Sequence, residues 1–311
     1  MTCALIESRR LFPSTHPVFV TLNEKRKVND HHYLVFGDLH GRILPAFRLA
    51  TEWCRDHGVV IDDLLQVGDM GYFPDPARMD KATQRHAKKD PLELGAQLIV
   101  EPNPLADQVF DEAECASTLW HTLGNHEDYE TIEERSTNGS GNQADFPLDA
   151  YVKVRCIRNG KASTLPGGLR VGALWGISGK RRRKTPDKAR IRTQCANQLS
   201  GTNFDVLLTH DSPADAIYEN SGSEAIRLLI HLAQPAFAFF GHYHGIGEEI
   251  RGGYGRTRVY HLNGLELQGR GGCAEEGSVG LLKWNGKEGS FEYLDPEWLK
   301  TFTRQNWKHR T

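Results

Sequence analysis

The sequence predicts an α/β fold, because short apolar runs of strand-forming residues alternate with stretches of helical periodicity. Each of five runs ends at a glycine or a histidine, where the chain can turn: residues 33–36, 64–67, 119–123, 206–209 and 237–240. Residues 43–57 repeat apolar side chains at helical spacing, so they form the crossover helix of a first βαβ unit. Strand ends that converge on one edge form the crevice where open α/β folds bind ligands.

The other elements of the N-terminal half follow in chain order. Residues 1–29 carry weak periodicity and predict an irregular N-terminal lead. Residues 70–117, which we call the insert, are rich in proline and charge. We interpret the insert as a lid or recognition element, with a disordered surface segment as the alternative. Residues 151–175 alternate well enough for two or three strands of a second sheet.

The C-terminal half predicts a helix followed by strands. The helix starts after residue 223, with Ser223 as its cap, and strands follow over residues 257–263, 278–284 and 290–294. A short helix from Pro296 opens a helical tail over residues 296–311. Two mixed sheets inside and helices outside make a four-layer α/β/β/α sandwich, with residues 30–295 as one domain.

A restricted set of polar residues follows the five runs. Its seven members are Asp38, His40, Asp69, Asn125, His210, His242 and His244. Carboxylate, imidazole and amide oxygen suit Mn²⁺, Fe or Zn²⁺, and the absence of thiolate argues against a structural zinc site. These residues suffice for two metal ions with a shared carboxylate and a shared hydroxide nucleophile. We expect two divalent ions (Mn, Fe, Zn or Ni), with Mn favoured.

Each cluster taken alone has a simpler explanation. Asp-x-His after a strand often arises by chance, Gly68-Asp69 reads as an ordinary turn, and a lone His210 is more often a hydrogen-bonded core histidine. Two patterns are more specific: Gly-Asn-His-Glu at 124–127, and the pair His242 and His244 on one side of an extended segment. The occurrence of all five clusters in this order, each directly after an apolar run, favours a metal centre.

The order D-x-H, G-D, G-N-H-E, H and G-H-x-H over residues 38–244 resembles that of the calcineurin-like metallophosphoesterases. The resemblance implies the four-layer fold and hydrolysis of phosphoric esters. It also implies one metal held by Asp38, His40 and His244, a second held by Asn125, His210 and His242, and Asp69 bridging them. His126 would not be a ligand but would contact the scissile phosphate and protonate the leaving oxygen, while Asn125 helps to stabilise the developing charge.

Further motifs narrow the branch of the family. Protein serine/threonine phosphatases carry G-D-x-V-D-R-G, in which the second Asp orients the acid histidine and the Arg binds phosphate. Residues 68–73 read G-D-M-G-Y-F and lack both. The layout is more similar to RNA lariat debranching enzymes, through G-L-R-V-G at 168–172, I-S-G at 177–179, H-D-S-P at 210–213 and G-S-E-A at 222–225. Those enzymes often have Cys where Asp38 stands, so the carboxylate here should hold the first ion more tightly.

We therefore interpret the chain as a phosphodiesterase acting on a nucleotide or nucleic-acid substrate. A phosphomonoesterase, acting on small molecules or proteins, is the alternative, and a non-catalytic scaffold is a third interpretation. Candidate substrate contacts are Arg42, Tyr243, Lys180, Arg181, Arg182 and Arg183. The last four begin a basic run over residues 180–192, which would bind the phosphate backbone of a nucleic acid. A solvated loop and helix face is the alternative for this run, because only Trp175 among aromatic residues lies nearby.

Composition fits an ordinary globular enzyme of 311 residues, with 39% hydrophobic and 25% charged residues. A net charge of −2 does not by itself predict a polyanion partner. No apolar run approaches the roughly 18 residues of a membrane span, and no signal-peptide region is evident, so we expect a cytoplasmic protein. The six cysteines are scattered, and we expect them to be reduced.

Overall fold

The computed structural model describes residues 30–112, 118–138, 143–179, 185–245, 247–267 and 271–308. Within these ranges the strands form a first sheet of seven strands and a second sheet of six. The first sheet has the order β13 (Gly289–Tyr293), β12 (Val279–Trp284), β1 (His31–Phe36), β2 (Asp63–Gln66), β3 (Leu119–His121), β5 (Val154–Ile157), β4 (Asp145–Pro147). The second has the order β10 (Glu248–Ile250), β11 (Arg258–His261), β9 (Phe237–Phe240), β8 (Val206–Thr209), β7 (Arg170–Leu174), β6 (Lys161–Thr164).

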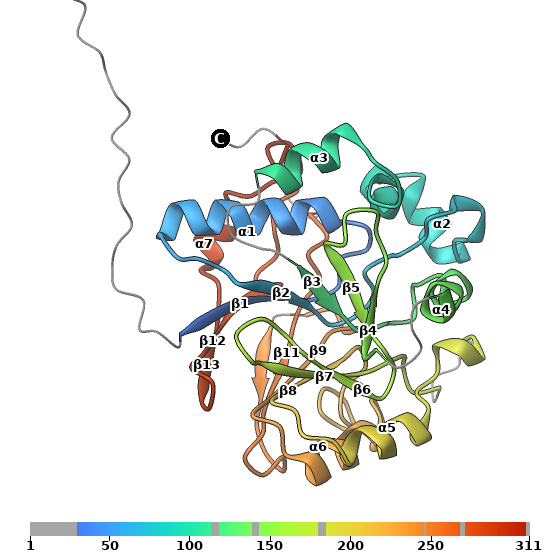
Figure 1. The fold of residues 1–311 in the computed structure, drawn as a ribbon, viewed down its shortest axis with the longest axis vertical. Helices are drawn as coiled ribbons and strands as arrows, with labels where there is room; N and C mark the ends of the chain where they lie inside the picture. Colours follow the sequence, from blue (N-terminus) through green and yellow to red (C-terminus); the bar gives the residue numbers. More distant parts are fainter. Residues whose placement is uncertain are drawn as a thin grey trace, which may run out of the picture.

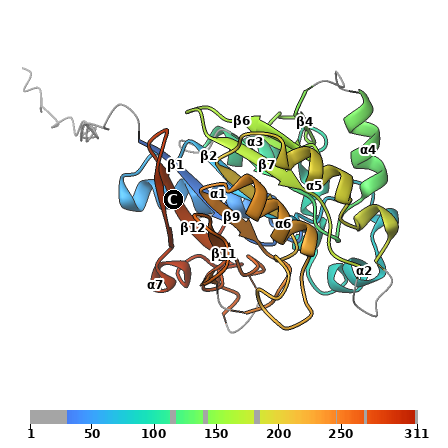
Figure 2. The same ribbon diagram turned by 90° about the horizontal axis from the view of Figure 1, so that it is seen from below.

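Helices cover the outer face of each sheet. Helices α1 (Ile43–His57) and α3 (Pro104–Asp111) lie over the first sheet, and α5 (Thr193–Ser200) and α6 (Glu224–Ala233) lie over the second (Figures 1 and 2). The remaining helical segments are η1 (Pro76–Arg78), α2 (Lys81–Ala87), η2 (Pro91–Leu98), α4 (Tyr129–Asn138), η3 (Asp187–Ala189) and α7 (Pro296–Leu299). This arrangement confirms the predicted four-layer sandwich.

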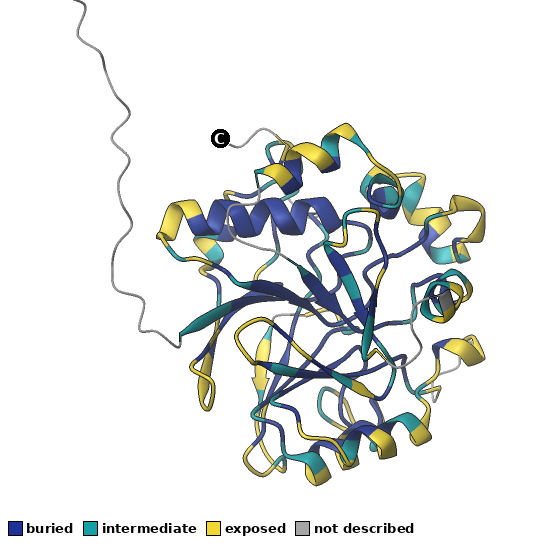
Figure 3. Cartoon of the chain, in the orientation of Figure 1, coloured by how far each residue is buried: buried dark blue, intermediate teal, exposed yellow. Residues whose placement is uncertain are grey.

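Apolar side chains fill the spaces between the layers. Strand β1 shows the alternation: Tyr33 and Val35 join the core between the two sheets, whereas Leu34 and Phe36 join the core under α1. Figure 3 shows the central strands as mostly buried, and the edge strands and the outward faces of the helices as largely exposed. Each large apolar side chain buried in this way contributes about 1.5–3 kcal/mol, so the layers hold the strand ends in fixed positions.

Parallel pairing aligns the strand ends that carry the polar clusters. In the first sheet, Phe36 pairs with Gln66 and Gln66 with His121, so β1, β2 and β3 end side by side. In the second sheet, β8 is paired in parallel with both β7 and β9. The two sheets thereby bring two sets of strand ends to a common edge.

The predicted elements are largely confirmed, with three corrections. Helix α1 and strands β8 and β9 have the predicted bounds. Residues 151–175 do form three strands, but β5 pairs with β3 and so belongs to the first sheet, not the second. The insert holds η1, α2, η2 and α3 in its described part, residues 70–112, so the disordered alternative is wrong there. The expectation of reduced cysteines is wrong for Cys54, which is disulfide-bonded.

Other predictions fall partly or wholly outside the described residues. The N-terminal lead over residues 1–29 lies outside them, as do Lys180, Arg181, Arg182 and Arg183. In the part of the chain that is described, no helix is both long enough and apolar enough to cross a membrane.

Candidate metal centre and active site

The loops after β1 and β2 are tied together and adopt an unusual backbone. The N–H groups of Leu39 and His40 both donate to the carbonyl oxygen of Asp69, at 3.0 and 2.9 Å. His40, Asp69 and His242 have φ angles of 42°, 51° and 68°, in the left-handed region that side chains rarely adopt. Each such residue costs on the order of 1–3 kcal/mol, and such strain gathers at functional sites.

Two of the glycines that follow the strands allow the backbone to approach a carboxylate closely. A Cβ atom built on Gly124 would lie 2.1 Å from Asp69 Oδ1, and one built on Gly241 would lie 2.1 Å from Asp38 Oδ1. Any side chain at either position would displace the carboxylate. These glycines are therefore required by the position of the carboxylates, in addition to their role at the turn.

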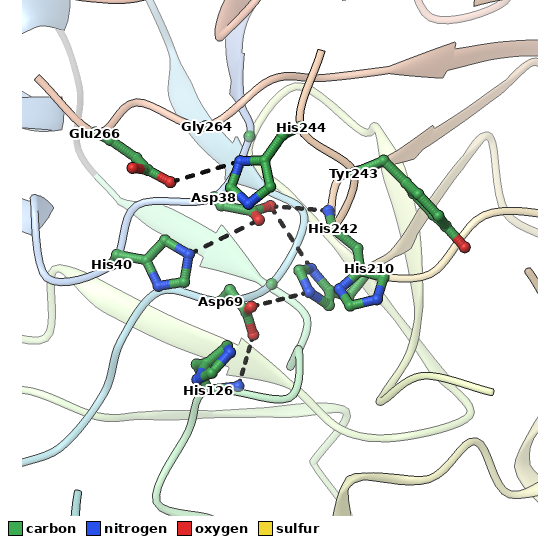
Figure 4. A network of polar contacts seen from close by, with 12 residues as sticks. Asp38, His40, Asp69, His126, His210, His242, Tyr243, His244, Gly264 and Glu266 are labelled. Atoms are coloured by element: carbon green, nitrogen blue, oxygen red, sulfur yellow. Dashed lines mark hydrogen bonds and ion pairs between the residues drawn. The ribbon is translucent and has the colours of Figure 1, made fainter. Parts of the chain in front are cut away.

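Five of the seven predicted ligands converge into two groups (Figure 4). One group contains Asp38, His40 and Asp69; the other contains Asp69, His210 and His242. In each group the potential ligand atoms lie within 4.8 Å of one another. Asp69 belongs to both groups, and its carboxylate lies between them. The bridging role that the family resemblance implies for Asp69 requires such a shared position and stays a prediction.

Two buried atoms in the site lack the hydrogen bond that burial normally demands. Asn125 Oδ1 and His210 Nε2 are both buried without a hydrogen-bond partner. The other ring nitrogen of His210, Nδ1, lies 3.2 Å from the carbonyl oxygen of Val67 and can donate to it. The lone pair of Nε2 is then directed at Asp69 Oδ2, 3.1 Å away. A proton or a cation must lie between two acceptors at this distance, and imidazole, carboxylate and amide oxygen together form a ligand set that fits a divalent metal ion.

Burial and mutual charge set the ionisation of the cluster. Burial raises the pKa of Asp38 to about 7, although His210 opposes the shift. Burial also disfavours charge on Asp69, but the neighbouring His210 and His126 outweigh it and hold the pKa of Asp69 well below its usual range. Burial lowers the pKa of His40 to about 3 and that of His242 to about 4. Both imidazoles are therefore neutral near pH 7, the state in which they bind metals.

His126 lies at the edge of the cluster and is held from two sides. Its backbone N–H donates to Asp69 Oδ1 at 2.7 Å, and its ring nitrogen Nδ1 lies 2.9 Å from Asp80 Oδ2. Burial lowers the pKa of His126, but the charge of Asp69 and the hydrogen bond to Asp80 outweigh burial and raise it to about 9. The ring is only partly buried and packs edge-on to His40, with centroids 5.5 Å apart.

His244 lies at the solvent side of the cluster. Its side chain is 85% exposed, and Nδ1 lies 4.0 Å from Glu266 Oε1 (Figure 4). The structure thus brings His244 to the rim of the site, beside Glu266, without including it in either group of potential ligands.

The prediction of Arg42 as a substrate contact is wrong. Its side chain has no exposed surface. The guanidinium donates to Asp90 Oδ2 at 2.5 Å and to Glu93 Oε1 at 2.6 Å, and also to the carbonyl oxygen of His40. Arg42 therefore joins the insert to the loop that carries His40, and it is closed off from solvent.

Among the other predicted substrate contacts, Tyr243 is the one that lies within the described residues. The hydroxyl of Tyr243 donates to Asp211 Oδ1 at 2.9 Å, and the ring points away from Asp69 (Figure 4). In the described part of the basic run, Lys188 lies 3.2 Å and Arg192 3.4 Å from carboxylate oxygens of Glu133. Glu133 thus offsets part of the positive charge in the described part of the basic run.

Asp80 and Glu127 support the site although no role was predicted for either. Asp80 comes from the insert, and its contact with His126 links segments far apart in the chain. Glu127 accepts from the N–H groups of Met70 and Tyr72, both at 2.8 Å, and so fixes the loop around Asp69. The position of Asp80 three residues before Thr83 indicates a helix cap, but nothing in that pattern indicates His126 as a partner.

The chain matches a known protein family and resembles several solved structures. The family model of the calcineurin-like phosphoesterases matches residues 31–245. One crystal structure, 14% identical, aligns with a TM-score of 0.51 over 86% of this chain and 100% of its own, a likeness of fold alone. A predicted phosphoesterase from Streptococcus pneumoniae TIGR4 aligns at 9% identity and a TM-score of 0.35, over 86% of this chain and 91% of that one. The 5'-nucleotidase of Candida albicans SC5314 aligns at 14% identity and a TM-score of 0.41, over 90% of this chain and 54% of that one.

None of the curated proteins matches the chain. The family match covers more than half of the sequence, including every cluster of potential ligands up to His244. The chain therefore belongs to the calcineurin-like phosphoesterase family and is a metal-dependent hydrolase of phosphoric esters.

Proposed function

We propose that the chain is a phosphodiesterase with two divalent metal ions, acting on a nucleotide or nucleic-acid substrate. The observation that carries the proposal is the shared position of Asp69 in two groups of potential ligands, next to His126. Asp38 and His40 would hold one ion, Asn125, His210 and His242 the other, and Asp69 both. His244 would complete the first set from the rim of the site.

Bound divalent ions would supply Lewis-acid activation of the phosphoryl group and make a water molecule more acidic. The chain's own residues would position the substrate and manage the proton. His126 would protonate the leaving oxygen, and the amide of Asn125 would stabilise charge at phosphorus. The neutral imidazoles of His40 and His242 would remain available as ligands near pH 7.

The pairing of Arg42 with two carboxylates favours a diester substrate over a monoester. A phosphate monoester is a dianion near neutral pH and needs more positive charge around it than a diester monoanion. Arg42 is the only arginine or lysine in the loop of residues 38–42, and its charge is neutralised by Asp90 and Glu93. The phosphate-binding Arg of the G-D-x-V-D-R-G motif is also absent from residues 68–73.

The test compares bis(p-nitrophenyl) phosphate with p-nitrophenyl phosphate. Metal-stripped protein would be reconstituted in turn with Mn²⁺, Fe²⁺, Zn²⁺ and Ni²⁺, and turnover and bound metal measured together. We expect metal-dependent cleavage of the diester, with two ions bound per chain. Cleavage of the monoester alone would transfer the assignment to a phosphomonoesterase, and absence of turnover with every metal would support a non-catalytic scaffold.

A further inference from the structure

The carboxylate of Asp80 serves a helix end and a histidine at the same time. Its Oδ1 accepts from the N–H groups of Ala82 and Thr83, at 2.8 and 3.1 Å, and so caps the start of α2. Its Oδ2 accepts from the Thr83 hydroxyl at 2.7 Å and lies 2.9 Å from Nδ1 of His126. Because the cap and the hydroxyl fix the carboxylate, Oδ2 is a rigid acceptor for the histidine ring.

A fixed acceptor at one ring nitrogen determines what the other nitrogen does. An ionised carboxylate can only accept, so Nδ1 of His126 must carry a hydrogen where it meets Asp80. The backbone N–H of His126 is held by Asp69, and the ring packs edge-on to His40. The backbone N–H, Nδ1 and the ring of His126 thus each have a fixed neighbour, and Nε2 is the nitrogen that remains for the substrate.

The carboxylate that meets His126 comes from the insert and not from the residues directly after Asp69. Residues 68–73 carry no second carboxylate after Asp69. The insert supplies one at the N-cap of α2, and its Asp90 and Glu93 bind Arg42, which donates to the carbonyl oxygen of His40. Both contacts are made with residues next to the potential ligands, so the insert is built into the site.

We propose that Asp80 is a positioning residue for His126: it holds Nδ1 so that Nε2 presents its proton to the leaving oxygen. The inference rests on the proposed function, because it requires His126 to act as the acid. In that step the water oxygen forms a new bond to phosphorus and releases a proton to solvent. The old P–O bond breaks, its electron pair stays with the leaving oxygen, and that oxygen takes the Nε2 proton while Nδ1 keeps its own.

The decisive variant is Asp80→Asn, because asparagine also caps helices well and α2 should persist. The carboxamide oxygen would occupy the capping position and turn its NH₂ group, a donor, toward Nδ1. Asp75→Asn is the matched control: Asp75 caps η1 in the same insert through the N–H of Ala77. The two aspartates differ in that Asp80 also meets His126.

Two diesters with different leaving groups separate positioning from folding. Diphenyl phosphate releases the more basic phenolate, which needs the acid, whereas bis(p-nitrophenyl) phosphate releases a stable anion. In the manganese-loaded enzyme, Asp80→Asn should lower kcat for diphenyl phosphate by about 10–100-fold. For bis(p-nitrophenyl) phosphate the loss should stay within about threefold, with KM and bound metal unchanged. In a His126→Ala background, Asp80→Asn should cause no further loss, and Asp75→Asn should match the parent protein on both substrates.

A spectroscopic readout needs neither metal nor turnover. Long-range ¹H–¹⁵N spectra of the metal-free protein, with the His126 signals assigned by His126→Ala, should show Nδ1 protonated in the parent and altered in Asp80→Asn. Equal losses on both substrates, loss of metal, or unchanged kinetics in Asp80→Asn would each overturn the inference. Absence of turnover by the parent protein would instead refute the proposed function, and unchanged ring spectra in Asp80→Asn would then refute the contact itself.

Discussion

Asp69 acts on its surroundings through both carboxylate oxygens. Oδ1 accepts from the backbone N–H of His126, and Oδ2 lies 3.1 Å from Nε2 of His210. One carboxylate therefore meets a potential ligand on one side and the candidate acid on the other. Substitutions at Asp69 and at His126 should consequently have different effects.

Asp69→Asn should lose bound metal and activity together, because an amide supplies one acceptor oxygen where two are needed. His126→Ala should keep its metal but lower kcat by about 10²–10⁴-fold, the usual contribution of a general acid. Metal analysis of the purified variants, alongside turnover of diphenyl phosphate, whose leaving group needs the acid, checks both statements. Loss of both metals from the His126 variant would show that His126 is a ligand.

His121 is a buried histidine outside the metal centre and should make stability depend on pH. It has no exposed surface, and burial lowers its pKa from 6.5 to about 4, against a smaller opposing effect of the hydrogen bond to Thr122. Above pH 6.5 neither the folded nor the unfolded chain binds the proton. Between pH 6.5 and 4 only the unfolded chain binds it, so the free energy of unfolding falls as the pH falls.

The expected loss is about 3 kcal/mol across that interval, since each pKa unit corresponds to about 1.4 kcal/mol. His121→Leu removes the group, so its unfolding free energy should decline less between pH 7 and pH 4 than that of the parent protein. Urea unfolding at several pH values measures the difference. Parallel curves for the two proteins would contradict a buried neutral His121.

At the scale of elements, the insert and the strand-end loops form one structure. The insert contacts the loop after β1 through Arg42 and contacts His126 through Asp80. These hydrogen bonds fix the insert to the site, whereas a mobile lid would be attached only at its ends. Glycines then allow the loops to pack directly against the carboxylates.

The loop after β9 offers a matched pair of substitutions. In Gly241→Ala the new Cβ would lie 2.1 Å from Asp38 Oδ1, whereas Gly245 has nothing within 4 Å of a built Cβ. Gly241→Ala should therefore weaken metal binding at least about tenfold by displacing Asp38, a cost of roughly 1.4 kcal/mol. Gly245→Ala should bind like the parent protein. Calorimetric titration of the metal-free proteins with Mn²⁺ measures both, and equal affinities would exclude the close approach at Gly241.

At the scale of the whole molecule, metal binding and folding are coupled. The potential ligands come from both sheets, so the complete set exists only in the folded chain. Mn²⁺ at 100 times its dissociation constant should add about 2.7 kcal/mol to the free energy of unfolding. Thermal melts with and without Mn²⁺ should differ by on the order of 5 °C or more, and Asp69→Asn should show no shift. An equal shift in the variant would place the stabilising ion elsewhere.

The layers and most strand ends could be predicted because apolar runs are local signals. The runs before Asp38, Asp69, Asn125, His210 and His242 became β1, β2, β3, β8 and β9. The assignment of β5 to a sheet could not be predicted, because pairing depends on distant partners. The burial of Arg42 and the contact between Asp80 and His126 were missed for the same reason: each joins the insert to a distant loop. The left-handed backbone of His40 follows from its surroundings rather than from its residue type.

The left-handed backbone at His40, Asp69 and His242 determines which substitutions at these positions would stabilise the chain. Glycine or asparagine at these positions would relieve strain, and would remove a buried carboxylate at Asp69. A lineage that kept the fold only as a scaffold would therefore gain stability by losing these side chains, and random substitution would tend to erase them. The side chains at these three strained positions are ones that a scaffold would not need and that a metal centre requires.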